Sequence, residues 1–103
     1  MKKKPQPVRV AVIQVAPVYL NLAASVRKAV GLMQQAARKG AKLVAFGETW
    51  LPGYPAWLDY CPDAALWGHP PVKQVFARLR QNSVAIPGNE VAEIGRASCR
   101  ERV

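Results

Sequence analysis

Residues able to hold a metal ion or to form a catalytic relay are scarce in this sequence. His69 is the one histidine, and Cys61 and Cys99 are the two cysteines. The cysteines stand too far apart for a Cys-x-x-Cys pair, and a single pair builds no disulfide framework. One histidine leaves little material for a histidine-rich metal site or for a Ser-His-Asp triad. The composition therefore argues against both kinds of centre.

Long apolar runs are also missing. No stretch approaches the roughly 18 residues of a membrane span. Residues 1–7 (Met-Lys-Lys-Lys-Pro-Gln-Pro) lead into a strand pattern instead of the apolar region of a signal peptide. We therefore expect a cytoplasmic protein with no membrane partner. The 103 residues are 50% hydrophobic, which excludes a disordered or collagen-like chain and fits one domain at most.

Acidic residues are few, with six Asp or Glu against 15 Lys or Arg and a net charge of +9. Much of the excess lies at the two ends of the chain, in residues 2–4 and 96–102. The other basic residues are spread mainly over two helix-like segments and form no stripe with stacking aromatic residues. We therefore predict no nucleic-acid partner.

Apolar periodicity predicts a strand, a helix and a second strand in the first half of the chain. Residues 8–15 are rich in β-branched residues and nearly continuously apolar, as is typical of a central strand. Asn21 can cap a helix over about 22–39, which Gly40 ends. Residues 43–46 form a short apolar run that suits a strand buried on both faces. Short connections between these elements predict a βαβ unit with parallel strands.

The second half of the chain is more helical. Residues 56–68 are aromatic and irregular, which indicates a packed loop or short helical turns. A helix is predicted from Pro70, with apolar side chains at helical spacing. Residues 83–86 resemble a short strand or a linker, and Asn89 can cap a further helix that begins around Glu90.

The pattern changes at Gly95. Residues 95–103 (Gly-Arg-Ala-Ser-Cys-Arg-Glu-Arg-Val) abandon apolar periodicity soon after the last predicted helix has begun. They are either a frayed basic terminus or a foreign segment that truncates the natural protein. We favour the second interpretation, because the chain ends before that helix is complete. The predicted organisation is a basic extension over 1–7, a partial domain over 8–94 and an unrelated tail over 95–103.

A single carboxylate follows the second predicted strand. Glu48 comes just after the apolar run, and Pro52, Gly53 and Pro55 then prevent a regular continuation. Proteins of the α/β class tend to place catalytic groups at the ends of buried strands. The alternative is a structural acid that tethers the turn.

Residues 40–55 (Gly-Ala-Lys-Leu-Val-Ala-Phe-Gly-Glu-Thr-Trp-Leu-Pro-Gly-Tyr-Pro) closely resemble the first signature of the nitrilase family of carbon-nitrogen hydrolases. The shared features are a glycine, an apolar strand, an aromatic residue two positions before the glutamate, and the Gly-Tyr-Pro ending. Residues 10–17 and the following helix also look like the start of that fold, so the resemblance runs from about Val8 to Ile94. The context of Trp50, Pro52 and Trp57 looks closer to true nitrilases and cyanide-converting relatives than to the amidase or carbamoylase branches.

The resemblance implies an α/β fold, the N-terminal part of a four-layer αββα sandwich. It also implies a Glu-Lys-Cys triad, in which Glu48 matches the glutamate and serves as general base for a cysteine nucleophile. In that family a thiolate attacks the nitrile carbon to give a thioimidate. Water then adds, ammonia leaves, and the resulting thioester is hydrolysed to the carboxylic acid. The role of Glu48 favours a partly buried carboxylate.

The same resemblance bears on cofactors and partners. The family's reaction needs no metal or organic cofactor, and its substrate is a small nitrile. Family members commonly form dimers and spiral oligomers, so the parent protein is expected to be a homo-oligomer.

The family's lysine and cysteine segments lie beyond the end of this chain. Lys42 and Lys73 are not in the family's lysine context, Cys61 is not in its nucleophile context, and Cys99 belongs to the suspect tail. We therefore expect this polypeptide to be truncated and inactive by itself. Cys61 is expected to be a small buried hydrophobe and His69 a helix-entry residue, with an opportunistic nucleophile and a site role as the respective alternatives.

Three aromatic residues, Trp50, Tyr54 and Trp57, are candidates for the lining of a nitrile pocket, and aromatic core packing is the alternative. Two other functions stay open: a non-catalytic α/β interaction module on the same scaffold, and an amidase or cyanide hydratase branch of the superfamily. Because the second sheet of the sandwich would be missing, we expect an under-covered sheet face and a marginally stable or aggregation-prone chain.

Overall fold

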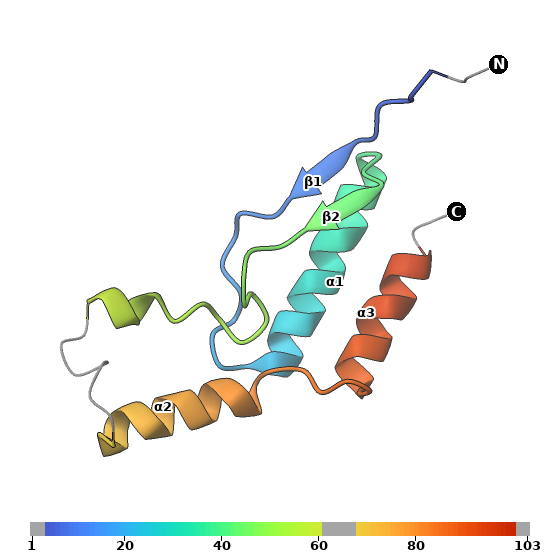
Figure 1. Cartoon of the computed structure of the whole chain (residues 1–103). Helices are drawn as coiled ribbons and strands as arrows, with labels where there is room; N and C mark the ends of the chain where they lie inside the picture. The colour runs from blue at the N-terminus through green and yellow to red at the C-terminus, as the bar shows by residue number, and fades with distance from the viewer. Residues whose placement is uncertain (1–3, 61–67, 101–103) are drawn as a thin grey trace.

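Two short strands lie side by side next to a long helix (Figure 1). In the computed structural model, β1 (Val10–Val12) pairs in parallel with β2 (Leu43–Ala45), and Val10 stands opposite Leu43. A hydrogen bond from Ile13 N to Ala45 O (2.8 Å) extends the ladder by one step. Both strands occupy the predicted segments but are shorter than the sequence pattern suggests.

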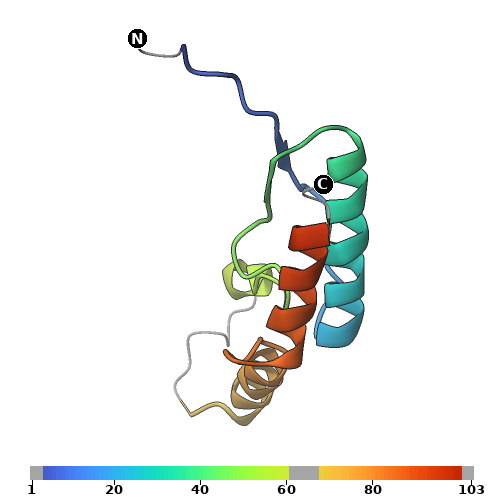
Figure 2. The same cartoon turned by 90° about the vertical axis from the view of Figure 1, so that its right-hand side faces the viewer.

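The helix α1 (Leu22–Arg38) connects the two strands and lies against one face of the sheet (Figures 1 and 2). Asn21 caps it, because its side-chain oxygen accepts a hydrogen bond from Ala24 N at 3.1 Å. Gly40 follows the last turn with a φ of 88°, a conformation that glycine adopts without steric cost. The structure therefore confirms the predicted helix, the parallel βαβ unit and the α/β class.

Only one face of this sheet is covered in the part of the chain that the structure describes. Side chains alternate between the two faces of a strand, so Ala11 and Val44 point to the α1 side and are partly buried. On the opposite face, Val10, Val12 and Leu43 are 47%, 68% and 58% exposed. The prediction that the strands are buried on both faces is therefore wrong for this chain, because no described element packs on the second face.

The later elements are helical. They are η1 (Ala56–Asp59), α2 (Pro70–Gln81) and α3 (Asn89–Arg100). Their positions confirm the short helical turn after residue 55, the helix from Pro70 and the helix near Glu90. Residues 83–86 form a linker, which was one of the two predicted alternatives, and the only described sheet is two-stranded.

The helix α3 packs alongside α1 and continues through residue 95 without a break (Figure 2). Ala97, inside the segment predicted to be an unrelated tail, is only 7% exposed. Up to Arg100 the chain is thus helical and not frayed, and apolar periodicity continues from Ile94 to Ala97. The prediction that residues 95–103 are foreign to the protein remains a prediction.

Buried apolar side chains gather where α1, α3 and the turn after β2 meet. This core includes Val26, Ala29, Ala36, Trp50 and Ala97. At the N-terminal end of α1, the side-chain oxygen of Asn82 accepts a hydrogen bond from Leu22 N (3.1 Å). That bond ties the end of α2 to the start of α1.

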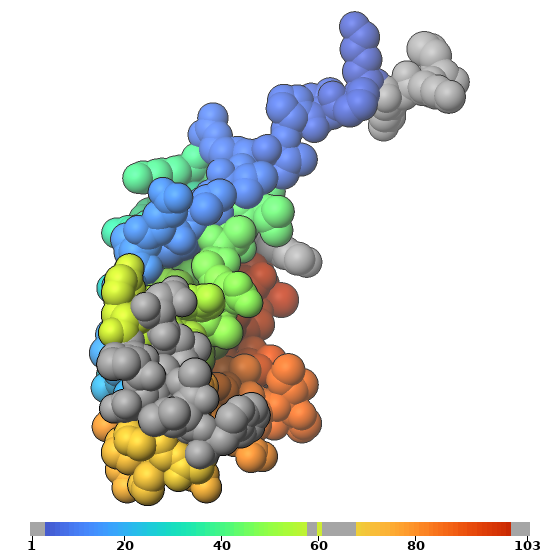
Figure 3. Space-filling model, turned by 60° about the vertical axis from the view of Figure 1, so that its left-hand side comes forward, coloured from blue at the N-terminus to red at the C-terminus, as the bar shows by residue number. Residues whose placement is uncertain are grey.

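The structure describes residues 4–60 and 68–100. The molecule measures 61 × 27 × 24 Å, with a radius of gyration of 17.4 Å. A compact domain of this length has a radius of about 13 Å, so the chain is elongated, and its first described residues stand away from the body (Figure 3). Among the described residues, no helix combines the length and the apolar character needed to cross a membrane.

Candidate active site

Glu48 begins the turn that follows β2. The backbone of this turn is held by hydrogen bonds from Thr49 Oγ1 to Glu48 O (2.8 Å) and from Gly53 N to Thr49 O (3.1 Å). Thr49 has a φ of 50°, in the left-handed region that β-branched residues rarely adopt. Strained residues of this kind cluster at functional sites, where the surrounding structure must hold them in place. The main chain of Glu48 is therefore set by a rigid, strained turn.

A hollow of about 300 Å³ opens beside Glu48 at the carboxyl ends of both strands. In open α/β sheets, ligands bind at this edge. Apart from Glu48 and Gly47, the lining is apolar or aromatic and consists of Ile13, Val15, Ala16, Pro17, Tyr19, Trp50 and Tyr54. Glu48 is thus the one carboxylate in this lining, and no lysine, cysteine or histidine of the described residues contributes to it.

Glu48 is exposed in this chain. The expectation of a partly buried carboxylate is therefore wrong for the structure as it stands. The physical reason is that the hollow is walled by β1, the loop after it and the turn itself, while its remaining side faces solvent. A carboxylate in such a position can accept a proton from a group that approaches from outside the described residues.

The structure brings two of the three candidate aromatic residues to the hollow. Trp50 is 8% exposed, donates a hydrogen bond from Nε1 to Val15 O (2.8 Å) and packs against Phe46 with 4.9 Å between ring centroids. Tyr54 is half exposed and also lines the hollow. Trp57 does not, because its ring packs against Phe76 of α2 with the centroids 5.5 Å apart.

The remaining candidates lie away from Glu48 or outside the described residues. His69 is the N-cap residue of α2, in agreement with its prediction as a helix-entry residue. Cys99 is exposed on α3 with a free thiol. Cys61 falls outside the described residues, so its predicted burial stays a prediction.

Tyr19 is a residue of the hollow that the sequence patterns did not single out. It belongs to residues 16–20, a part of the connection between β1 and α1 that we call the Tyr19 loop. The predicted parallel pairing of the two strands could have indicated it. Parallel strands end at the same edge of a sheet, so the residues after the first strand lie near the residues after the second.

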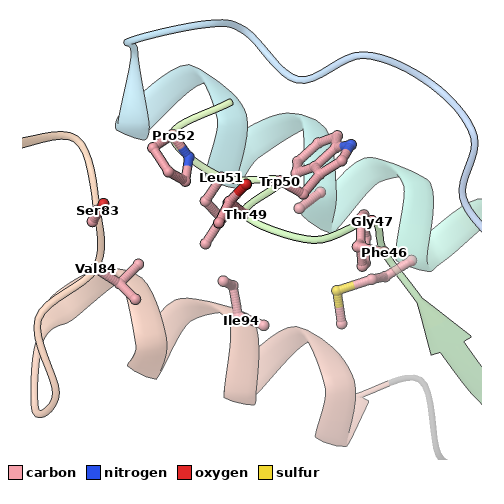
Figure 4. A pocket seen from close by; sticks show the side chains of 11 residues that line it. Phe46, Gly47, Thr49, Trp50, Leu51, Pro52, Ser83, Val84 and Ile94 are labelled. Carbon is pink, nitrogen blue, oxygen red and sulfur yellow. The ribbon is translucent and has the colours of Figure 1, made fainter. Parts of the chain in front are cut away.

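A second cavity, of about 420 Å³, lies on the other side of the Glu48 turn, between α1 and α3 (Figure 4). Its lining contains no ionisable side chain and includes Met33, Phe46, Leu51, Val84 and Ile94. The cavity is therefore an apolar space next to the core, and the carboxylate of Glu48 lies in the other hollow. Within the described ranges, no cluster of three or more His, Cys, Asp or Glu side chains could bind a metal ion.

Fold and hollow together define an α/β protein that presents one carboxylate at the carboxyl edge of a parallel sheet. The family model described as "Carbon-nitrogen hydrolase" matches residues 9–103, and the chain belongs to this family. The resemblance to the family of carbon-nitrogen hydrolases is thereby confirmed at the level of the family. The matched range also includes the segment predicted to be an unrelated tail.

Curated relatives of the chain carry nitrilase names. It is 50% identical to an arylacetonitrilase from Fusarium vanettenii over 95 residues, which are 92% of this chain and 25% of that relative. It is 43% identical to an arylacetonitrilase from Aspergillus oryzae over 91 residues, or 88% of this chain and 25% of the relative. A nitrilase from Pseudomonas syringae pv. syringae is 43% identical over 95 residues, which are 90% of this chain and 26% of that relative. The chain therefore spans about a quarter of the length of these relatives.

Proposed function

We propose that this chain is the glutamate-bearing part of a nitrile hydrolase and that Glu48 is the general base of its active site. The observation that carries the proposal is the hollow that combines Glu48 with Trp50 and Tyr54, in a chain 50% identical to an arylacetonitrilase over 95 residues. In this proposal the parent protein supplies the lysine and the cysteine of the triad from a segment that this chain does not span.

The exposed position of Glu48 suits a base whose nucleophile arrives from another segment. In the proposed reaction, Glu48 takes the proton of the cysteine thiol, the thiolate attacks the nitrile carbon, and the proton passes from Glu48 to the nitrile nitrogen as the thioimidate forms. A water molecule then adds and ammonia leaves, which gives a thioester. A second water molecule, deprotonated by Glu48, hydrolyses the thioester to the carboxylic acid. The strained turn at Thr49 supports this role because it fixes the backbone from which the carboxylate projects.

The substrate class that we propose is an arylacetonitrile. Aromatic and aliphatic side chains dominate the lining of the hollow, so an aryl group can be desolvated there while the nitrile carbon is held near the one carboxylate. The names of the Fusarium and Aspergillus relatives support the same class.

A hybrid enzyme tests this proposal. Residues 8–94 of this chain replace the matching segment of the Fusarium vanettenii relative, whose remaining sequence completes the enzyme. We expect the hybrid to release ammonia and phenylacetic acid from phenylacetonitrile. Glu48→Gln keeps the shape of the side chain but removes the base, and it is expected to lower kcat by about 10²- to 10⁴-fold.

Glu90→Gln is the matched control, because Glu90 lies on α3 and does not line the hollow. It should leave kcat unchanged, and the thermal unfolding of both variants should match that of the hybrid. Phenylacetamide as the main product would point instead to the hydratase branch of the superfamily. Full activity of Glu48→Gln would contradict the catalytic role of Glu48, whereas a folded hybrid without activity would favour the non-catalytic interaction module.

A further inference from the structure

The Tyr19 loop is fixed to the rest of the structure at several points. Ser25 of α1 is fully buried, and its Oγ both donates to Val18 O (2.8 Å) and accepts from Val18 N (3.1 Å). Lys28 Nζ donates to Ala16 O, and Leu20 N donates to Pro52 O (3.1 Å) in the Glu48 turn. These bonds join the loop to α1 on one side and to the Glu48 turn on the other. The position of residue 19 is therefore set by its neighbours.

Tyr19 lies directly against the backbone of Gly53. A Cβ atom placed on Gly53 would stand 2.3 Å from Tyr19 Cδ1, a distance that real Cβ atoms do not reach. Gly53 also has a φ of 103°, so glycine is required there for two reasons. Tyr19 is nevertheless 60% exposed and forms part of the lining of the hollow that contains Glu48.

A tyrosine that served only to cover Gly53 would not need to line the Glu48 hollow. Leu20, its neighbour, has a φ of 53°, which is unfavourable for a residue with a side chain of that size. The loop thus combines a strained backbone and a buried serine anchor with an aromatic ring that stays open to solvent. This combination is typical of a preorganised binding wall.

We propose that Tyr19 determines specificity for the aryl group of the substrate, by stacking against that group in the Glu48 hollow. The inference rests on the proposed function and extends it to a residue outside the triad. An aromatic ring held by its backbone loses little conformational freedom when it packs against a second ring. The contact does not touch the reacting nitrile, so it acts on substrate selection and not on the chemical step.

The test uses the hybrid enzyme with two nitriles, phenylacetonitrile and propionitrile. Tyr19→Ala is expected to lower kcat/KM for phenylacetonitrile by about tenfold, mainly through a higher KM. The value for propionitrile should change by less than about threefold, because this substrate has no aryl group. Tyr19→Phe should behave like the unsubstituted hybrid, whereas Tyr19→Leu, which fills the space without an aromatic ring, should behave like Tyr19→Ala. Tyr60→Ala is the control, since Tyr60 is 84% exposed and does not line the hollow.

Binding is measured separately from catalysis. The Kd of phenylacetonitrile, determined by ligand-observed NMR in the Glu48→Gln background, is expected to rise by a similar factor with Tyr19→Ala. Equal losses for both nitriles, or an unchanged Kd, would overturn the role of Tyr19. An inactive hybrid, or a fully active Glu48→Gln variant, would instead overturn the proposed function, and the Kd comparison would still decide whether Tyr19 binds the aryl group.

Discussion

Thr49 and Leu20 both have positive φ values, 50° and 53°, and both belong to segments that wall the Glu48 hollow. Each such residue costs on the order of 1–3 kcal/mol, so the surrounding contacts must compensate for it. The hydrogen bond from Leu20 N to Pro52 O joins the two strained segments directly. We infer that the geometry beside Glu48 is maintained at some expense of stability, as expected where side chains must be held for chemistry.

Two glycine substitutions should change stability in opposite directions. Gly53→Ala introduces a Cβ at a positive φ and against the Tyr19 ring, so the free energy of unfolding of the hybrid enzyme should fall by at least about 1–3 kcal/mol. Gly31→Ala lies inside α1, where nothing stands within 4 Å of the new atom, and should raise it by about 0.5–1 kcal/mol. Urea unfolding followed by tryptophan fluorescence checks both. A Gly53→Ala variant as stable as the hybrid would contradict the close approach of Tyr19.

The helices were the elements that the sequence predicted best. Asn21 and Gly40 mark the two ends of α1 by local chemistry, a side-chain cap and a left-handed glycine, and the structure agrees to within a residue. The strands were less predictable because their burial depends on partners distant in sequence. An apolar run such as residues 43–46 indicates that a strand is suited to burial on both faces. It does not indicate whether other elements cover both faces of the sheet.

The difference between local and distant signals also explains why the sequence indicates Glu48 as a candidate site residue and does not indicate Tyr19. Glu48 was found because it stands in a local motif, between an apolar strand and a proline-rich turn. Tyr19 was missed because its place in the hollow depends on the parallel pairing of β1 with β2 and on the anchor at Ser25. Its exposure to solvent, like that of Glu48, also depends on which segments surround the hollow, and no local pattern encodes them.

The helix α3 provides a test of the boundary predicted at residue 95. The structure continues the helix to Arg100 and buries Ala97, whereas the sequence predicts a foreign segment from Gly95 onward. Two hybrids differ only in this segment, one with residues 8–94 of this chain and one with residues 8–103 in place of the corresponding residues of the relative. We expect the longer graft to lower the thermal unfolding midpoint by several degrees, because a foreign sequence would replace residues of the relative that pack against the remainder of that enzyme.

The second measurement for this comparison is kcat/KM for phenylacetonitrile, which should fall along with the yield of soluble enzyme. Equal stability and activity of the two hybrids would show that residues 95–103 are compatible with the family's fold. The buried position of Ala97 would then reflect a native helix contact.

Taken as a whole, the molecule has little core for its length. Its radius of gyration of 17.4 Å exceeds the value of about 13 Å for a compact domain of this length. One face of the sheet presents Val10, Val12 and Leu43 to solvent. Exposed apolar side chains that adjoin one another mark a surface that packs against something else. In a chain that spans about a quarter of its relatives, we expect that surface to be covered by the remainder of the parent protein.

The bare sheet face is expected to cause self-association of the chain when nothing covers it. Val12→Thr keeps the β-branched shape on the exposed face while adding a hydroxyl, and Ile86→Thr makes the same kind of change at a linker residue that is 81% exposed. In the 103-residue chain, we expect sedimentation velocity to detect self-association that Val12→Thr reduces and Ile86→Thr does not, because only the first substitution alters the apolar face.

In the hybrid enzyme the face is expected to be covered, so Val12→Thr should lower the free energy of unfolding by about 1–3 kcal/mol through burial of a polar group. Ile86→Thr should leave it nearly unchanged. Equal effects of the two substitutions in both proteins would contradict the idea that this face is an internal surface of the parent fold.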